Sequence, residues 1–174
     1  MNLEEKTIEE DLKYEGSFIK VIKQVVKLPN GNTSTRDIVR HPGGVAVAAL
    51  FDDDTILLVE QYRKPIDKVT LELPAGKREN GEDPKICGIR ELEEETGLKA
   101  EKFEFLGKIA ISPGFCDEYI YLYKAEGLYK GQINRDDDEF INVKKIKITE
   151  FKEMIRRGEI TDAKTIAVLS YLEI

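Results

Sequence analysis

Residues 76–98, with the sequence GKRENGEDPKICGIRELEEETGL, constrain this chain more than any other segment. Within them Glu91, Glu94 and Glu95 are three and four residues apart, so on a helix their side chains project toward one side. Carboxylates gathered in this way repel one another unless a cation lies among them. Hard oxygen ligands suit Mg²⁺ or Mn²⁺ better than zinc, which prefers His and Cys, and the chain has one His and two Cys. The segment therefore predicts a helix that binds a divalent metal.

Local signals define both ends of this helix. Asp83 is suited to the N-cap position and Pro84 to the first helical position. Gly97 is placed to end the helix in a left-handed conformation. We therefore expect a helix that runs over residues 84–96.

The apolar residues of the same helix indicate which face packs on the protein. Ile86, Ile89 and Leu92 lie at helical spacing, and we expect them to form the buried face. Gly88 lowers helix stability by about 1 kcal/mol relative to alanine. Its presence in the middle of the helix predicts close packing against a sheet.

Length and charge limit the classes of protein that fit. A chain of 174 residues is one domain by the usual prior and buries roughly 70% of its unfolded surface. Lys and Arg number 27 against 34 Asp and Glu, a net charge of −7. This balance argues against a general surface for nucleic acid or for an anionic membrane. A phosphorylated ligand must then be met by local cations or by metal.

The chain also shows no feature of an exported or membrane protein. Cys87 and Cys116 are too few for a disulfide framework, and we expect both to be reduced. The N-terminal residues are acidic, unlike a signal peptide, and no apolar run approaches the roughly 20 residues needed to span a bilayer. We expect a cytoplasmic protein.

Short strands make up most of the remaining sequence. Residues 17–28 and 33–41 alternate apolar and polar side chains around the turn LPNGN, which predicts an N-terminal antiparallel hairpin. Residues 43–52 and 55–63 are strongly apolar and predict a second, central hairpin. The small residues Ala48 and Ala49 suggest close packing there. Three further strands and two amphipathic helices are predicted over residues 102–112, 118–128, 140–149, 150–160 and 162–174.

The acidic segment resembles the sequence box of the Nudix hydrolases. That box is Gly, five residues, Glu, seven residues, Arg-Glu, an aliphatic residue, any residue, Glu-Glu, any residue, Gly and an aliphatic residue. The chain fills every fixed place, with Gly76, Glu82, Arg90, Glu91, Leu92, Glu94, Glu95, Gly97 and Leu98. The plain alternative, a solvated acidic helix face, leaves both glycines and Glu82 unexplained.

The resemblance implies an α+β fold, an α/β/α sandwich with a mixed β-sheet between helices, here preceded by the N-terminal antiparallel hairpin. We therefore divide the chain into a hairpin and dimerisation subdomain over residues 1–42 and a Nudix hydrolase domain over residues 43–174. No linker or internal repeat suggests any other division.

Hydrolysis of a diphosphate requires neutralised oxygens, an activated water and a stabilised leaving phosphate, and divalent ions can supply all three. We expect Mg²⁺, with Mn²⁺ as the other possibility. The predicted ligands are Glu91 and Glu95, with Glu94 third, and the family usually adds a backbone oxygen, here the Ala75 carbonyl. Glu82 is assigned to the outer shell. Arg90 is four residues from Glu94 and either orients a carboxylate for the metal or forms an ordinary intrahelical ion pair.

A second motif points to the substrate. In the Nudix branch that hydrolyses ADP-ribose, a proline commonly stands sixteen residues beyond the last glycine of the box, within an SPG turn. Pro113 has this position, although an ordinary Pro-Gly turn is the plain alternative. The segments EQYRKP, LELPAG and DDDEFINV also resemble that branch. The resemblance implies cleavage of ADP-ribose to AMP and ribose 5-phosphate.

The late acidic segment supplies a candidate general base. In this branch a glutamate on a mobile loop after the core strands is the usual candidate for handling the water, and Glu139 is our choice. Asp138 is the alternative, or a further metal ligand. A solvated loop is the plain interpretation of RDDDE. A glutamate of the box that lies between the metals is another possible base, and for this reason Glu94 is also a candidate catalytic residue.

Contacts with the rest of the substrate are assigned to five residues. Arg63, Arg36 and Arg40 are candidates for pairing with phosphates, because guanidinium forms bidentate contacts. Glu72 is a candidate acceptor for the adenine or ribose, and Pro113 belongs to the implied substrate loop. The chain has no Trp to stack on adenine, unlike some relatives, and Phe18, Tyr14 or another ring is a candidate substitute.

We expect a homodimer acting on a small nucleotide sugar. An isolated hairpin is only marginally stable in water, and in hydrolases of this resemblance the N-terminal hairpin pairs two subunits. Arg36 or Arg40 would then reach the partner's site. Two alternatives for the activity remain: another nucleoside diphosphate sugar such as GDP-mannose, or a non-catalytic ADP-ribose sensor. Sensors tend to lose box carboxylates, whereas this chain keeps all of them.

Overall fold

The computed structural model describes residues 2–135 and 139–172. The chain forms two compact units. Residues 1–43 and 110–119 make up the first unit, and residues 44–109 and 120–174 make up the second. The sequence division at residue 42 assigned residues 110–119 to the larger part of the chain.

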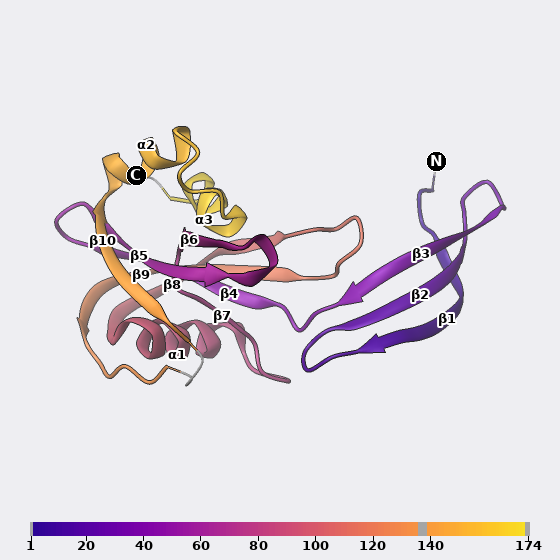
Figure 1. The fold of residues 1–174 in the computed structure, drawn as a ribbon, viewed down its shortest axis with the longest axis horizontal. Coiled ribbons are helices and arrows are strands. Elements are labelled where there is room, and N and C mark those ends of the chain that lie inside the picture. Colours follow the sequence, from indigo (N-terminus) through magenta and orange to yellow (C-terminus); the bar gives the residue numbers. More distant parts are fainter. Residues whose placement is uncertain (1, 136–138, 173–174) are drawn as a thin grey trace. The chain divides into compact units, whose positions relative to one another are not determined.

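The first unit is built on a three-stranded antiparallel sheet in the order β1-β2-β3 (Figure 1). Its strands are β1 (Lys6–Glu15), β2 (Lys20–Lys27) and β3 (Thr33–Arg40). The predicted hairpin corresponds to β2 and β3, whose turn is closed by the Leu28 amide on the Asn32 carbonyl at 2.8 Å. Strand β1 was not predicted, because its sequence KTIEEDLKYE lacks a regular apolar alternation and all ten residues are exposed.

Residues 110–119 attach to the edge of β3 within the first unit. The Val39 amide donates to the Phe115 carbonyl at 2.7 Å, and the Asp117 amide donates to the Val39 carbonyl at 3.1 Å. The amides of Phe115 and Cys116 both bond the Ser112 carbonyl. Pro113 therefore lies in a tight turn, between β8 and β9 in the chain, that is bonded to the end of β3.

The second unit contains a seven-stranded mixed sheet. Its main path is β10-β5-β4-β9-β8, while β6 pairs with β5 and β7 pairs with β4. The strands are β4 (Gly44–Phe51), β5 (Thr55–Arg63), β6 (Lys68–Glu72), β7 (Ala75–Lys77), β8 (Leu98–Ala110), β9 (Tyr119–Lys130) and β10 (Ile141–Lys147). The β4–β9 pair is parallel and the other registered pairs are antiparallel.

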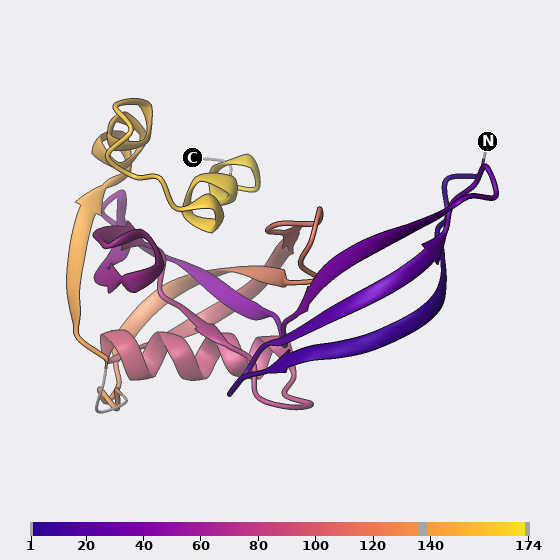
Figure 2. The ribbon, with the colours of Figure 1, turned by 45° about the vertical axis from the view of Figure 1, so that its right-hand side comes forward.

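Helices cover both faces of this sheet. Helix α1 (Pro84–Thr96) lies on one face, and α2 (Ile148–Arg156) and α3 (Ala163–Ala167) lie on the other (Figures 1 and 2). Short 3-10 turns occupy Lys64–Ile66 and Val168–Ser170. The predicted α+β sandwich is confirmed. No helix in the described ranges is long and apolar enough to cross a membrane.

The ends of α1 fall where the sequence placed them. The Asp83 carboxylate accepts from the amides of Lys85 at 2.9 Å and Ile86 at 3.3 Å, so it caps the helix. At the other end Gly97 adopts φ 70°, and its amide donates to the Glu93 carbonyl at 2.8 Å. A left-handed residue of this kind is most readily a glycine.

The predicted buried face of α1 was wrong for two of three residues. Leu92 is buried, but Ile86 and Ile89 are 59% and 38% exposed. The inward face instead consists of Cys87, Gly88, Glu91, Leu92, Glu95 and Thr96. Carboxylates occupy part of the inward face, so the spacing of apolar residues alone misplaces it.

Close packing is confirmed at the small residues. A Cβ added at Gly88 would lie 2.9 Å from Cζ of Phe103, so a larger residue would force the Phe103 ring or the helix to shift. Ala48 and Ala49 in β4 are fully buried. The predicted central hairpin pairs over a short stretch, Leu50 with Ile56 and Phe51 with Thr55.

Candidate active site

Strand β7 and helix α1 meet at a contact that only glycine allows. A Cβ built on Gly76 would lie 1.8 Å from Cδ of Glu91, inside the carboxylate itself. Gly76 is the first residue of the acidic segment, and Glu91 is the first of its three clustered glutamates. The glycine therefore lets the Glu91 carboxylate rest directly against the backbone of β7.

Glu95 lies against the same strand. Its side chain is buried, with 2% of the residue exposed, and its Oε2 accepts a hydrogen bond from the Ala75 amide at 3.0 Å. The Ala75 peptide is thus next to both the glycine contact and the second carboxylate. This is the backbone position from which the sequence predicted a metal-binding carbonyl.

For the two inward carboxylates, burial outweighs the positive charge nearby. Burial raises the pKa of Glu91 to about 7 despite the nearby charge of Arg90, and repulsion from Glu94 and Glu139 adds to the rise. Burial likewise raises the pKa of Glu95 to about 8, although the Ala75 amide opposes the rise. A cation between these carboxylates would favour their charged forms.

The donor set fits a hard divalent ion. Two carboxylates and an adjacent backbone carbonyl offer only oxygen, which is the preference of Mg²⁺ and Mn²⁺. Within residues 2–135 and 139–172, however, no group of three or more His, Cys, Asp or Glu side chains forms a ready metal cage. Glu94 is drawn toward Arg90 instead, with its Oε2 2.8 Å from Nη1.

Arg90 contacts three carboxylates of the acidic segment. Its Nε and Nη2 donate to the two oxygens of Glu82 at 3.0 and 3.1 Å. Its Nη1 lies 2.8 Å from both Glu91 and Glu94. The guanidinium therefore fixes the direction of all three side chains, and the ion pair with Glu94 is one part of that arrangement.

Glu82 serves as the main counterion of Arg90. The hydrogen bond from Arg90 lowers the pKa of Glu82 to about 2, and the Glu79 amide also donates to it at 2.9 Å. Its two oxygens are therefore occupied by the Arg90 fork. This placement is compatible with the predicted outer-shell role.

Glu139 lies close enough to the cluster to affect it. It is half-buried, and its negative charge contributes to the raised pKa of both Glu91 and Glu95. Asp138, the alternative candidate, lies outside the described residues. The structure therefore brings together Glu139 and the box glutamates, and the roles assigned to them stay predictions.

A second charged network lies beside the cluster in the same unit. Arg63 donates through Nε and Nη2 to the two oxygens of Glu72 at 2.8 and 2.6 Å, and Thr70 donates to the same carboxylate at 2.5 Å. Lys164 of α3 also bonds Glu72 and contacts Asp162 at 3.0 Å. Glu72 and Lys164 are buried, whereas the side chain of Arg63 is 41% exposed.

Arg63 links the two clusters electrostatically. Its hydrogen bond with Glu72 raises the pKa of Arg63, and the negative charge of Glu95 adds to the rise. Its bonds to Glu72 use Nε and Nη2 and leave Nη1 for another partner. Lys164 was not predicted, because a lysine in the apolar run of the last helix gives no sign of a buried acid 92 positions away.

Arg36, Arg40 and Pro113 all belong to the first unit. They lie around one hollow of about 420 Å³, together with Glu5, Asp117 and Tyr119. Arg36 makes a two-point contact with Glu5 at 2.9 and 2.5 Å, and Arg40 bonds Asp117 at 3.0 Å. The structure brings these three predicted residues together, whereas the predicted metal ligands are all in the second unit.

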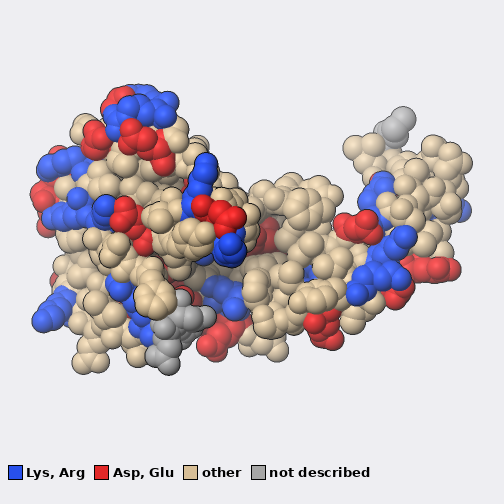
Figure 3. Space-filling model, viewed as in Figure 1, with Lys and Arg blue, Asp and Glu red and all other residues tan. Residues whose placement is uncertain are grey.

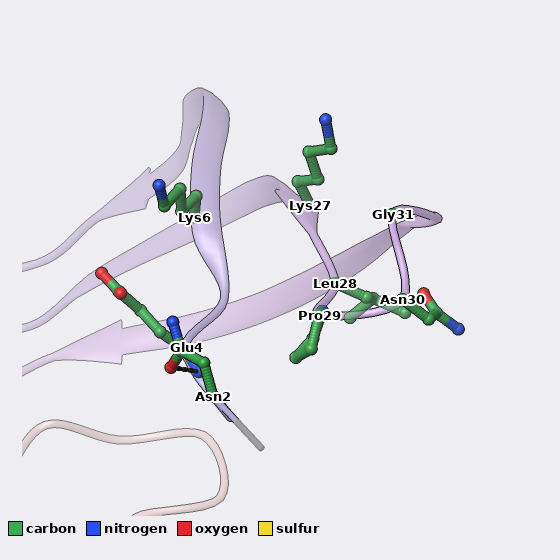
Figure 4. Close-up of a pocket in the computed structure, with 8 residues that line it drawn as sticks. All are labelled: Asn2, Glu4, Lys6, Lys27, Leu28, Pro29, Asn30 and Gly31. Carbon is green, nitrogen blue, oxygen red and sulfur yellow. Dashed lines mark hydrogen bonds between the residues drawn. The ribbon is translucent and has the colours of Figure 1, made fainter.

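Two other surfaces contain none of the predicted site residues. A hollow of about 680 Å³ lies at the turn of the first unit, lined by Asn2, Glu4, Lys6, Lys27, Leu28, Pro29, Asn30 and Gly31 (Figure 4). Over α2, charges of both signs are mixed (Figure 3), and Arg157 bonds Glu150 at 2.7 Å and Glu159 at 2.6 Å. Such a mixed surface is not the one-sign patch that nucleic acid requires.

Comparison with known proteins identifies the family of this chain. The model of the NUDIX domain matches residues 40–169. A methanol dehydrogenase activator of Bacillus methanolicus is 47% identical over 173 residues, covering 98% of this chain and 94% of that protein. ADP-ribose pyrophosphatases of Bacillus subtilis strain 168 and Mycobacterium tuberculosis are 41% and 34% identical, covering 99% and 93% of this chain and 95% and 80% of their own lengths.

A solved structure shows the same fold. The crystal structure of an ADP compounds hydrolase superposes with a TM-score of 0.86 at 18% identity, covering 98% of this chain and 94% of that one. The chain therefore belongs to the Nudix family. Its fold is a mixed sheet between helices, with the glutamate-rich helix α1 packed against β7 at Gly76. The resemblance found in the sequence is confirmed.

Proposed function

We propose that this protein is a metal-dependent hydrolase that cleaves the diphosphate of ADP-ribose to AMP and ribose 5-phosphate. The observation that carries the proposal is the pair of buried carboxylates, Glu91 and Glu95, held against Ala75 and Gly76, with the neighbouring Arg90 shared among Glu82, Glu91 and Glu94. The substrate follows from the two ADP-ribose pyrophosphatases that align with nearly the whole chain.

Glu91, Glu95 and the Ala75 carbonyl would hold Mg²⁺ or Mn²⁺, and Glu94 would join them when it leaves Arg90. Bound there, the metal supplies charge neutralisation and water activation. Arg90 keeps the carboxylates oriented through its contacts with Glu82 and Glu91. Orientation of this kind matters because ligands held in place by a second layer of bonds bind metal more tightly.

Glu139 would take the proton of the attacking water. The water oxygen forms a bond to one phosphorus of the diphosphate, and the bond from that phosphorus to the bridging oxygen breaks. The bridging oxygen leaves with the other phosphate, so the products are AMP and ribose 5-phosphate. Glu139 is the proposed base because it lies close enough to Glu91 and Glu95 to act on them electrostatically, and these two residues would hold the metal and its water. Asp138 remains the proposed alternative as base or as further ligand.

Arg63 would bind a phosphate oxygen of the substrate through Nη1. Glu72 is the group that holds Arg63 in place, since its two oxygens receive bonds from Arg63, Thr70 and Lys164. Because these donors occupy the carboxylate, Glu72 would act through Arg63, and a direct bond to adenine or ribose would have to displace one of them.

A homodimer is proposed from the exposed strand β1. Its apolar residues Ile8, Leu12 and Tyr14 are 52%, 49% and 58% exposed, which is unusual for three such residues on one strand. A second copy would cover this face and bring Arg36 or Arg40 to the partner's substrate. Residues 1–42 would then be the dimerisation part and residues 43–174 the hydrolase part of a cytoplasmic enzyme.

One other substrate has a specific observation in its favour. A GDP-mannose pyrophosphatase of Yersinia enterocolitica is 32% identical and covers 91% of this chain. The two substrates share a nucleoside diphosphate joined to a sugar, so the metal site suits both. They differ in the base and in the sugar, whose contacts decide the preference.

A substrate panel tests the proposal. ADP-ribose, GDP-mannose, diadenosine polyphosphates and NADH would each be incubated with the protein, Mg²⁺ and alkaline phosphatase, which releases phosphate only after the diphosphate is cut. We expect ADP-ribose to give the highest kcat/KM, with AMP and ribose 5-phosphate as products before phosphatase is added. A preference for GDP-mannose would select the second candidate, and no cleavage of any compound would overturn the hydrolase.

A further inference from the structure

Residues 131–135 are bonded to the end of α1 and to the residue that follows it. The last carbonyls of a helix have no partner within it and must be satisfied elsewhere. Here the Asn134 amide donates to the Glu94 carbonyl at 3.2 Å, and the Gly131 amide donates to the Gly97 carbonyl at 2.8 Å. Residues 131–134 therefore lie alongside the C-terminal end of α1, the helix that bears the box glutamates.

Arg135 completes this attachment with a two-sided contact. Its Nε and Nη2 donate to the Glu95 carbonyl at 2.9 and 2.5 Å. Its Nη1 donates to the Ile141 carbonyl at 2.8 Å. One guanidinium thus joins the last turn of α1 to the first residue of β10.

The two residues whose carbonyls accept from Arg135, Glu95 and Ile141, are themselves held in place. The Glu95 side chain is buried and bonded to β7, and Ile141 is 7% exposed and pairs with Gln61 of β5. Glu139 is two residues before Ile141, and two residues of extended chain span at most about 7 Å. The position of the Ile141 carbonyl therefore limits where Glu139 can lie.

We propose that Arg135 is a positioning residue that holds Glu139 against Glu91 and Glu95. The inference rests on the proposed function, in which Glu139 handles the attacking water. Arg135 contacts backbone carbonyls and no carboxylate of the site in these bonds, so it acts through the chain that carries Glu139.

Arginine suits this role better than lysine. The planar guanidinium has donors that point in different directions, and here three of its nitrogens serve two carbonyls. A lysine would keep the favourable charge at the end of the helix, but its single ammonium lacks the fixed fork. Arg135→Lys therefore removes the hydrogen bonds that join the Glu95 and Ile141 carbonyls but keeps the positive charge.

The decisive experiment compares Arg135→Lys in two backgrounds. In the parent we expect kcat to fall by about tenfold to a hundredfold, as for a slightly misplaced catalytic group, with KM and Mn²⁺ affinity unchanged. In the Glu139→Gln background the same substitution should change kcat by less than about twofold, because the group that Arg135 positions is already disabled. Arg156→Lys, on the exposed side of α2, is the matched control and should have no effect in either background.

Two results would overturn the proposal. An equal loss of kcat in both backgrounds would show that Arg135 acts independently of Glu139, and a loss of Mn²⁺ affinity would show that it acts on α1 and its ligands. If the parent cleaves no nucleoside diphosphate, the proposed function fails by itself. Hydrogen exchange then tests whether Arg135 holds the start of β10 in place. Arg135→Lys should speed exchange of the amides of residues 139–143 at least about fivefold, and unchanged exchange would contradict the positioning role of Arg135.

Discussion

At the scale of single residues, the site depends on side chains that touch backbone. Glu91 rests on Gly76, and Glu95 accepts from the Ala75 amide. These contacts place two carboxylates in an environment that disfavours their charge, which is a common property of functional sites. The framing glycine is thus explained by the space that a carboxylate needs.

The first prediction separates base from ligand among the late acids. Glu139→Gln should lower kcat at least about tenfold, because a lost general base costs 10²–10⁴-fold and water retains part of the function. Its dependence on Mg²⁺ concentration should stay unchanged. Asp138→Asn should instead shift the Mg²⁺ requirement if Asp138 is a ligand. Steady-state kinetics over a Mg²⁺ series measure both effects, and full turnover in both variants would place the base within the box.

The network around Glu72 has a consequence for stability. Burial alone would raise the pKa of Glu72, but the bonds and charges of Arg63 and Lys164 outweigh burial and lower it to about 2. A group whose pKa is lower in the folded state contributes stability above its unfolded pKa and loses that stability as the pH falls. For Glu72 the window runs from about pH 5 down to about pH 2.

The second prediction follows from this window. At pH 7 Glu72→Gln should unfold more easily than the parent, by up to about 3 kcal/mol for the charge alone. The difference should shrink as the pH falls from 5 toward 2, where the parent's Glu72 also becomes neutral. Urea unfolding of both proteins across this range measures it. A difference that stays constant with pH would contradict a charged, network-bound Glu72.

At the scale of elements, α1 shows what sequence can and cannot determine. Asp83 and Gly97 act on neighbouring backbone groups, so the ends of the helix were predictable from local sequence. Its buried face was not, because Ile86 and Ile89 repeat at the same helical spacing as the true inward residues. A face that carries the carboxylates Glu91 and Glu95 departs from the usual rule that apolar residues point inward.

The third prediction tests which face of α1 is buried. Leu92→Ala should lower the free energy of unfolding by about 2–5 kcal/mol, as for a deleted core side chain. Ile86→Gln should change it by less than about 0.5 kcal/mol, since this side chain is largely exposed. Chemical denaturation followed by circular dichroism gives both values. Equal costs for the two substitutions would restore the face predicted from the sequence.

Other misses share a cause in sequence separation. Arg135 bonds a carbonyl 40 positions away, and Lys164 bonds a carboxylate 92 positions away, so neither local spacing nor residue type reveals the partner. The parallel pairing of β4 with β9 is likewise non-local. Strand β1 was missed for a different reason, because its residues are mostly charged and it buries none of them.

At the scale of the whole molecule, the exposed apolar residues of β1 raise the question of what covers them. Sheets with an open, partly apolar strand tend to pair with another chain. The structure describes one chain, and pairing with a second copy remains our proposal. In the proposed dimer, Arg36 or Arg40 of one subunit would reach the substrate site of the other.

The fourth prediction concerns this dimer. Light scattering should give about twice the mass of the 19.8 kDa chain at micromolar concentration. Glu95→Gln and the double variant Arg36→Ala, Arg40→Ala should each be nearly inactive. After unfolding and refolding together in equal amounts, they should recover about a quarter of the parent's activity, because each mixed dimer contains one intact site. An active monomer, or no recovery on mixing, would contradict shared sites.

Measurement of kcat/KM for ADP-ribose with and without Mg²⁺ decides whether Glu91 and Glu95 hold the divalent metal for cleavage. The parent should form AMP and ribose 5-phosphate only with Mg²⁺ or Mn²⁺. Glu95→Gln, which removes one charge and almost no volume, should fold normally and lose at least about a hundredfold in rate, as when several kcal/mol of transition-state stabilisation are removed. A Glu95→Gln protein that cleaves ADP-ribose within about twofold of the parent would contradict the account.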